Sequence, residues 1–197
     1  EIPLRLVGSE MCIRDSSYAV VPFHIGEERF AAEGRALAER AGQLARSAAD
    51  KAGNGVRVAG SLPPLFGSYR PDLFQPERVG EVLTPLLEGL APHVDLWLAE
   101  TQSAIAEARA IHAHLPKDGK PFWLSFTLRD EDTDEVPRLR SGEPVADAAR
   151  AAAELGVEVL LFNCSQPEVI GDAIDAARDT FASLGAVSYT HLRAHET

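Results

Sequence analysis

Residues 94–128 read VDLWLAETQSAIAEARAIHAHLPKDGKPFWLSFTL, and this stretch decides the fold. It opens with an apolar run, residues 94–99, that predicts a short buried strand. Residues 103–114 then predict a helix, and residues 122–128 form a second apolar run that predicts another strand. Strands that alternate with helices and are apolar on both faces are typical of a parallel sheet covered by helices.

The same alternation continues on both sides of this stretch. The segments before it are a helix with apolar residues seven apart (27–51), a strand (56–60), a proline-rich loop to Gln75 and a helix (77–90). The segments after it are a charged loop (129–143), a helix (144–155), a strand (157–162) and a helix (167–184). The chain therefore predicts four strand–helix units behind one leading helix.

Two α/β architectures use this pattern, an open doubly wound sheet and a closed (β/α)8 barrel. No GxGxxG motif follows the first predicted strand, which weakens the dinucleotide-binding version. Polar residues stand at the C-terminal end of every predicted strand, where a barrel would gather them in one pocket. These residues are Ser61, Glu100, Thr101, Ser125, Thr127, Asn163 and Cys164. Because a full barrel needs about 250 residues, we expect half to two-thirds of one.

Composition excludes several classes of protein. The 197 residues are 45% hydrophobic, enough for a core, and the formal net charge of −11 argues against nucleic-acid binding. No apolar run reaches the length of about 18 residues that a membrane helix needs. The only cysteines are Cys12 and Cys164, which excludes a disulfide framework and suggests a reducing cytoplasm.

The two ends differ from the rest in composition and rhythm. Residues 1–16 (EIPLRLVGSEMCIRDS) and 187–197 (VSYTHLRAHET) resemble translated sequencing-adapter read-through. We expect both to be non-native tails and residues 17–186 to form one domain. Cys12 belongs to the first tail, so Cys164 is then the single cysteine of the domain.

Two strand-end residues could carry chemistry. Cys164 precedes a predicted helix, whose dipole favours a thiolate, and soft thiolates bind zinc. A lone cysteine is more often a core residue, however, and no CxxC or HxxxH motif accompanies it within residues 17–186. Glu100 could bind an ammonium group or act as a general base, or it could be an ordinary acid before a helix.

Six stretches, taken in order, resemble the homocysteine S-methyltransferase family. They are SYAVVPFHIG, VRVAGSLPPLFGSYRPDLF, DLWLAETQSAIAEARAI, KPFWLSFTLRD, LRSGEPVADA and VEVLLFNCSQPEVI. The resemblance implies a (β/α)8 barrel, running here from the end of the second strand through the sixth helix. It also implies an enzyme that moves a methyl group from a small donor onto the sulfur of homocysteine to give methionine.

The resemblance assigns roles to four residues. Family members hold zinc with three cysteines, and the Asn163-Cys164 pair resembles the one that supplies the first of them. Glu100 resembles the acid that holds the substrate ammonium, and Asn163 and Ser17 would also bind substrate. The first-strand motif and the other two cysteines are absent, so we expect weak zinc binding and no turnover.

Some alternatives stay open at this point. The loop after Ser61 departs from the usual family sequence, so the methyl donor is not identified. A metal-free binding barrel with a structural Cys164, or a lyase that binds a phosphorylated substrate, would share the same strand–helix pattern. We expect homocysteine and a small methyl donor as partners, without nucleic acid or membrane.

Overall fold

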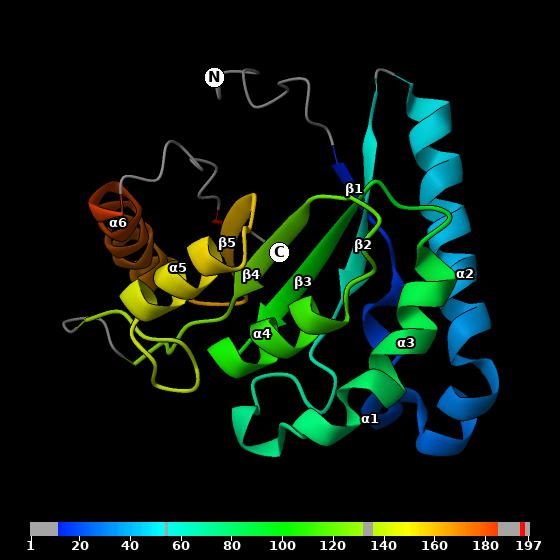
Figure 1. The fold of residues 1–197 in the computed structure, drawn as a ribbon, viewed down its shortest axis with the longest axis horizontal. Coiled ribbons are helices and arrows are strands. Elements are labelled where there is room, and N and C mark those ends of the chain that lie inside the picture. The colour runs from blue at the N-terminus through cyan, green and yellow to red at the C-terminus, as the bar shows by residue number, and fades with distance from the viewer. Residues whose placement is uncertain (1–11, 54, 132–135, 185–193, 196–197) are drawn as a thin grey trace.

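The computed structural model describes residues 12–53, 55–131, 136–184 and 194–195. Its centre is a parallel sheet whose strands pair in chain order. The strands are β1 (Cys12–Arg14), β2 (Arg57–Leu62), β3 (Leu96–Gln102), β4 (Phe122–Phe126), β5 (Val159–Asn163) and β6 (Ala194–His195). Figure 1 shows the helices packed around this curved sheet. They are α1 (Pro22–Ile25), α2 (Glu27–Ala52), α3 (Val79–Leu90), α4 (Ile105–His114), α5 (Val145–Glu154) and α6 (Pro167–Ser183).

The strand order distinguishes the two α/β architectures. A doubly wound sheet reverses direction at a switch point, so its strand order differs from the chain order. Here β1 to β6 follow one another without reversal, as they do when a barrel is wound in one direction. The predicted partial (β/α)8 barrel is confirmed. None of the described helices is long and apolar enough to cross a membrane.

The two faces of the sheet bury different sets of residues, as the two-residue period of a strand requires. One face packs against the helices and includes Trp97, Leu124 and Phe162 in the main core. The other face lines the inside of the curved sheet and forms a smaller apolar cluster. Its buried members are Ala59, Leu96, Leu98, Val159 and Leu161.

Two strands extend further than their apolar runs, whereas the predicted strand 122–128 ends earlier, at Phe126, and the predicted strand 157–162 begins later, at Val159. The predicted strands 56–60 and 94–99 continue in the structure to Leu62 and Gln102. A prediction from hydropathy ends a strand at its last apolar residue, but the backbone hydrogen bonds between strands continue past polar side chains on the inner face. The predicted helix start at residue 77 is also early, because Pro76–Arg78 forms a 3₁₀ turn before α3.

Part of the predicted non-native tail lies in the sheet. Cys12–Arg14 runs parallel to β2, with Cys12 opposite Arg57 and Arg14 opposite Ala59. At the other end of the sheet Ala194–His195 pairs with β5. Pairing does not report the origin of a segment, so the non-native tails stay a prediction. Residues 1–11, 185–193 and 196–197 lie outside the described part of the chain.

Helices α2 and α3 pack closely at Gly89. A Cβ atom added to Gly89 would lie 2.6 Å from the backbone oxygen of Arg35 and 2.8 Å from the backbone nitrogen of Glu39. Both distances are shorter than any ordinary contact of a Cβ atom, and both partners are backbone atoms of α2. The absence of a side chain at position 89 therefore sets how closely these helices approach.

Glu107 caps the N-terminus of α4 from within the fold. Its Oε2 accepts hydrogen bonds from the backbone N–H groups of Ser103 (2.6 Å) and Ala104 (3.1 Å). The pKa of Glu107 is raised from 4.5 to about 7, chiefly by burial and in smaller part by the nearby Glu143 carboxylate, although the two hydrogen bonds lower it. The folded protein therefore binds a proton at Glu107 more tightly than the unfolded chain does.

This raised pKa predicts a pH-dependent stability. The contribution of Glu107 is greatest below pH 4.5, its unfolded pKa, and it is lost as pH rises through about 7. We expect this group to lower the free energy of unfolding by about 1–3 kcal/mol between about pH 5 and pH 8. Urea unfolding over this range measures the change. Glu107→Gln has no proton to lose, so its stability should change less with pH; parallel curves for both proteins would contradict the prediction.

Candidate functional site

A pocket of about 540 Å³ lies inside the curved sheet, at the C-terminal ends of the strands. Barrel enzymes place their active sites at this end. Its walls combine apolar side chains of the inner face with polar side chains from the ends of the strands. The lining residues are Cys12, Arg14, Tyr18, Ala59, Tyr69, Leu98, Glu100, Thr101, Trp123, Ser125, Leu161, Asn163 and Cys164.

Strand periodicity explains why polar groups from different strands meet here. Glu100 follows Leu98 by two residues on β3, and Asn163 follows Leu161 by two residues on β5. Side chains two residues apart lie on the same face of a strand. Both polar groups therefore lie on the inner face, next to the apolar cluster and nearer the C-terminal ends of the strands, where they line the pocket. The structure therefore brings together Glu100, Asn163 and Cys164, three of the four predicted site residues.

Asn163 connects β3, β4 and β5. Its Oδ1 accepts a hydrogen bond from Ser125 Oγ at 2.8 Å, and its Nδ2 donates to Thr101 Oγ1 at 2.9 Å. The same Nδ2 lies 3.3 Å from Cys164 Sγ and donates to it. These three partners fix the amide orientation and direct an N–H group at the sulfur. A donor of this kind stabilises negative charge on sulfur.

Two residues of the pocket wall have an unusual backbone. Thr101 (φ 60°) and Cys164 (φ 53°) both adopt the left-handed conformation, which L-residues other than Asn and Asp rarely do. The pairing of β3 with β4 also shifts register between Ala99 and Gln102. Both irregularities fall where a strand ends at the pocket. Strained residues of this kind concentrate at functional sites.

Glu100 is almost completely buried and has two partners. Its Oε1 accepts hydrogen bonds from Arg14 Nη1, at 2.8 Å, and from Ser61 Oγ. The sequence does not predict Arg14 as a site residue, because residues 1–16 are predicted to be a non-native tail. One feature of the sequence could have indicated Arg14. It lies three residues before Ser17, where the resemblance to the family begins.

Ser17 lies behind the pocket wall and does not line the cavity. It is fully buried, and its Oγ donates to the carbonyl of Ser61 at 3.1 Å. Asp15 supports the same corner by accepting the backbone N–H groups of Ser17 and Ser61, each at 2.6 Å. Burial raises the pKa of Asp15 even though these hydrogen bonds favour its charge. Ser17 and Asp15 thus hold the end of β2, which carries Ser61 to Glu100.

Two tyrosines form the rim next to Cys164. Tyr18 exchanges a hydrogen bond of 2.8 Å with Ser68 Oγ, and burial raises the pKa of its phenol. Tyr69 also adopts a left-handed backbone (φ 63°) and carries the Arg140 guanidinium 5.4 Å from its ring centre. Tyr69 and Cys164 line the same pocket, so the loop after β2, which carries Tyr69, extends toward the end of β5.

The pocket presents the thiol of Cys164, a group that can bind zinc. Zinc in proteins takes four ligands, and a thiolate is a preferred one. Cys164 is partly exposed at the pocket and receives the Asn163 N–H bond. Within the described residues, however, no group of three or more His, Cys, Asp and Glu side chains could hold a metal ion. The described residues therefore assemble no complete metal site around Cys164.

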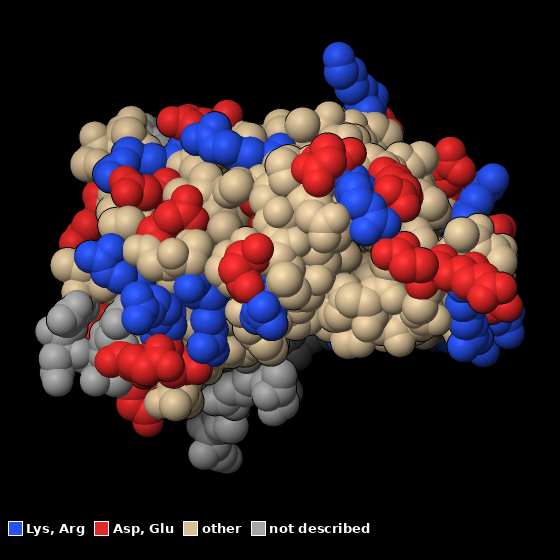
Figure 2. Space-filling view, turned by 90° about the horizontal axis from the view of Figure 1, so that it is seen from below, with Lys and Arg blue, Asp and Glu red and all other residues tan. Residues whose placement is uncertain are grey.

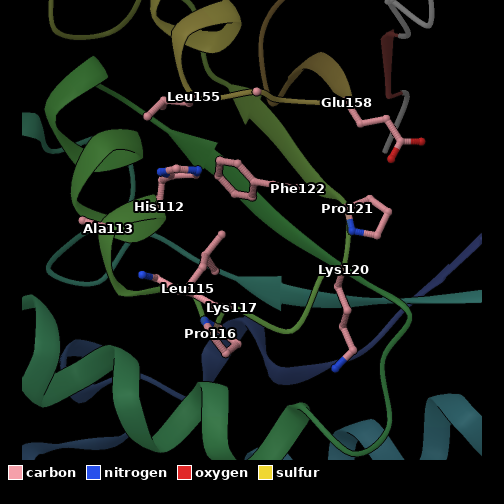
Figure 3. Close-up of a pocket in the computed structure, with 11 residues that line it drawn as sticks. His112, Ala113, Leu115, Pro116, Lys117, Lys120, Pro121, Phe122, Leu155 and Glu158 are labelled. Atoms are coloured by element: carbon pink, nitrogen blue, oxygen red, sulfur yellow. The ribbon is translucent and has the colours of Figure 1, made fainter.

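A second hollow of about 600 Å³ lies at the opposite end of the sheet (Figure 3). It is bounded by the end of α4, the start of β4 and the turn between α5 and β5. His112 packs against Phe122 there, with 5.4 Å between the ring centres, and Lys120 is held by Asp118 at 2.9 Å. The N-terminal ends of barrel strands serve stability, so we place the site at the other end.

The model of the homocysteine S-methyltransferase family matches residues 7–195. The chain belongs to this family. Figure 2 shows acidic and basic side chains interspersed over one face of this family member. None of the curated proteins compared with the chain matches it.

Solved structures of a homocysteine methyltransferase, MmuM from Escherichia coli, share the fold. The metallated form is 27% identical with a TM-score of 0.71, the oxidised form 25% with 0.68, and the apo form 26% with 0.65. The matches cover 94%, 94% and 86% of this chain. They cover 66%, 66% and 62% of the MmuM chains, so this chain spans a little less than two thirds of their length.

Proposed function

We propose that this chain is the homocysteine-binding part of a homocysteine S-methyltransferase, which transfers a methyl group to the sulfur of homocysteine and gives methionine. The observation that carries the proposal is that Glu100 and Cys164 line one pocket. A buried carboxylate suits the substrate ammonium, and a thiolate suits a metal that binds the substrate sulfur. The domain proposed for this role is 17–186, and a reducing cytoplasm would keep Cys164 a free thiol.

Each residue of the site has a part in this proposal. Glu100 binds the ammonium group and so fixes one end of homocysteine. Cys164 holds zinc with its thiolate, and the Asn163 amide orients that thiolate through its N–H bond. Zinc, when bound, would lower the pKa of the substrate thiol; the thiolate then forms a bond to the methyl carbon of the donor while the bond between that carbon and the donor breaks, and its electron pair leaves with the demethylated donor. Ser17 acts indirectly, through Ser61, on the position of the Glu100 carboxylate.

The metallated form of the MmuM relative supports a metal in this family. Because the described residues supply one ligand, we expect this chain to bind zinc weakly and to turn over no substrate by itself. Metal analysis of the purified chain tests this expectation. One tightly bound zinc per chain, accompanied by methyl transfer, would contradict it.

The site proposal is tested by replacing Glu100 with glutamine. Glutamine keeps the shape of the side chain and an acceptor oxygen but loses the charge that attracts an ammonium group. We expect L-homocysteine, titrated calorimetrically in the presence of Zn²⁺, to bind about 10- to 100-fold more weakly.

The exposed Glu154 of α5, which pairs with Arg109 on the surface, offers a matched control. Glu154→Gln should leave homocysteine binding unchanged. If the two variants bind equally well, Glu100 does not hold the ammonium group. If the unchanged chain binds no homocysteine with Zn²⁺ present, the proposed function is wrong.

A further inference from the structure

The guanidinium of Arg140 joins two loops beside the pocket. Its Nη2 lies 2.6 Å from Asp130 Oδ2, and its central carbon lies 5.4 Å from the centre of the Tyr69 ring. Tyr69 belongs to the loop after β2, whereas Arg140 and Asp130 belong to the loop between β4 and α5. The Arg140 and Asp130 side chains are only 22% and 21% exposed, so water screens their ion pair less than it screens a pair on the open surface.

Asp130 also holds the turn that follows Cys164. Its Oδ1 accepts the backbone N–H of Gln166, the residue before α6, at 2.8 Å. A second bond joins the same two segments, because Thr127 Oγ1, just after β4, donates to the carbonyl of Cys164 at 3.2 Å. The left-handed backbone of Cys164 (φ 53°) is therefore held by contacts from the loop after β4.

Tyr69 meets Cys164 in the pocket. Both side chains line the cavity. Burial raises the pKa of the Tyr69 phenol, its interaction with the Cys164 side chain raises the pKa further, and Arg140 lowers it. Tyr69 has a left-handed backbone (φ 63°) and is 43% exposed, so packing fixes its ring only in part. The contact with the Arg140 guanidinium supplies a further constraint on the ring.

We propose that Arg140 is a positioning residue that holds the Tyr69 phenol against Cys164. Asp130 fixes both the guanidinium of Arg140 and the turn that carries Cys164. A tyrosine ring attracts a cation that lies over its face, and a planar guanidinium suits this contact better than an ammonium group does. The inference rests on the proposed function, in which Cys164 presents its sulfur to a metal in one orientation.

Two other roles for Arg140 predict different results. If Arg140 only stabilised the chain, its removal would loosen the fold without a particular effect at Cys164. If its charge acted directly on the sulfur, its removal would disfavour the thiolate and slow the reactions of Cys164. If Arg140 holds Tyr69 in place, its removal exposes the sulfur and speeds those reactions.

The reactivity of the two cysteines distinguishes these roles. The whole chain is treated with iodoacetamide at one fixed pH, and mass spectrometry of its peptides measures the alkylation rate of each cysteine. Cys12 is the internal reference, because it lines the same pocket on β1, which β2, β3 and β4 separate from β5. We expect Arg140→Gln to raise the rate at Cys164 about tenfold and to leave the rate at Cys12 unchanged.

Further variants test whether Arg140 acts through Tyr69. Tyr69→Ala removes the ring and should raise the rate at Cys164 by a similar factor. The double variant should react no faster than Tyr69→Ala, because residues that act through one contact have non-additive effects. Arg140→Lys keeps the charge without the planar group and should fall between. Arg109→Gln is the matched control: its ion pair with Glu154 also spans 2.6 Å, and its loss should change neither rate.

Circular dichroism establishes that each variant is folded. An unchanged or slower rate at Cys164 in Arg140→Gln overturns the inference. So does a double variant that reacts faster than Tyr69→Ala. A rise at both cysteines in Arg140→Lys as well as in Arg140→Gln also overturns it, because the substitutions then loosen the whole chain.

Alkylation needs neither zinc nor homocysteine, so this inference and the proposed function can fail separately. Calorimetric titration with L-homocysteine, with Zn²⁺ and with a chelator, tests the function in the same variants. Zinc-dependent binding together with alkylation that is insensitive to Arg140 leaves the proposed function intact and the inference wrong. A specific rise at Cys164 in a chain that binds no homocysteine supports the positioning role and counts against the methyltransferase.

Discussion

Replacing Gly89 with alanine is expected to lower the free energy of unfolding by about 2–4 kcal/mol. The added methyl group would meet backbone atoms of Arg35 and Glu39 at 2.6 and 2.8 Å. A flexible side chain could turn away from such a contact, but backbone atoms inside α2 cannot. The helices must therefore separate, which weakens the packing of the main core to which Ala38 of α2 and Leu86 of α3 both belong.

Urea unfolding followed by circular dichroism measures this change. The matched control is Gly171→Ala in α6, where an added Cβ meets no atom within 4 Å. Because alanine favours a helix over glycine, this control should raise stability by about 0.5–1 kcal/mol. If both substitutions were stabilising, the close approach of α2 and α3 would not depend on Gly89.

Replacing Cys164 with serine is expected to abolish the effect of zinc on homocysteine binding. A serine hydroxyl is nearly the same size as the thiol, but it does not ionise near neutral pH and is a poor zinc ligand. Binding of the amino-acid head group at Glu100 should persist, because it does not involve the sulfur. The expected result is a weak affinity for L-homocysteine that is the same with Zn²⁺ and with a chelator.

Cys12 provides the control for Cys164. It is the other free cysteine, is also partly exposed and lines the same pocket, but lies on β1, where burial raises the pKa of its thiol. Cys12→Ser should therefore leave the zinc effect in place. Retention of the zinc effect in Cys164→Ser, or its loss in Cys12→Ser alone, would show that Cys164 is not the zinc ligand.

Most of the fold could be predicted from periodicity. The amphipathic segments became α2, α3, α5 and α6, and the apolar runs became β2 to β5. The strand ends could not be predicted in the same way, because Ser61 and Glu100 are polar and still belong to the ladder. Their hydrogen bonds to the neighbouring strands depend on the backbone, which carries no hydropathy signal.

The site was predicted in part. Glu100, Asn163 and Cys164 stand after apolar runs, so their shared pocket could be expected from the barrel alone. The contribution of Arg14 and Asp15 could not, since it comes from contacts with β2 and β3, far away in the chain. Composition also assigns these two residues to the predicted non-native tail of residues 1–16.

The order of the strands has a consequence for assembly. Since β2 to β5 pair only with their neighbours along the chain, each strand–helix unit finds its partners within the next unit or the previous one. Proteins whose contacts join neighbouring units along the chain gain stability as each unit is added. Their folding does not require segments that are far apart in the sequence to meet first. A barrel built this way is divisible: separately made pieces can each take their own shape and then join along open strand edges. A fragment that carries Glu100 and Cys164 could then form a complete pocket by pairing its edge strands with those of a second fragment that supplies the remaining strands.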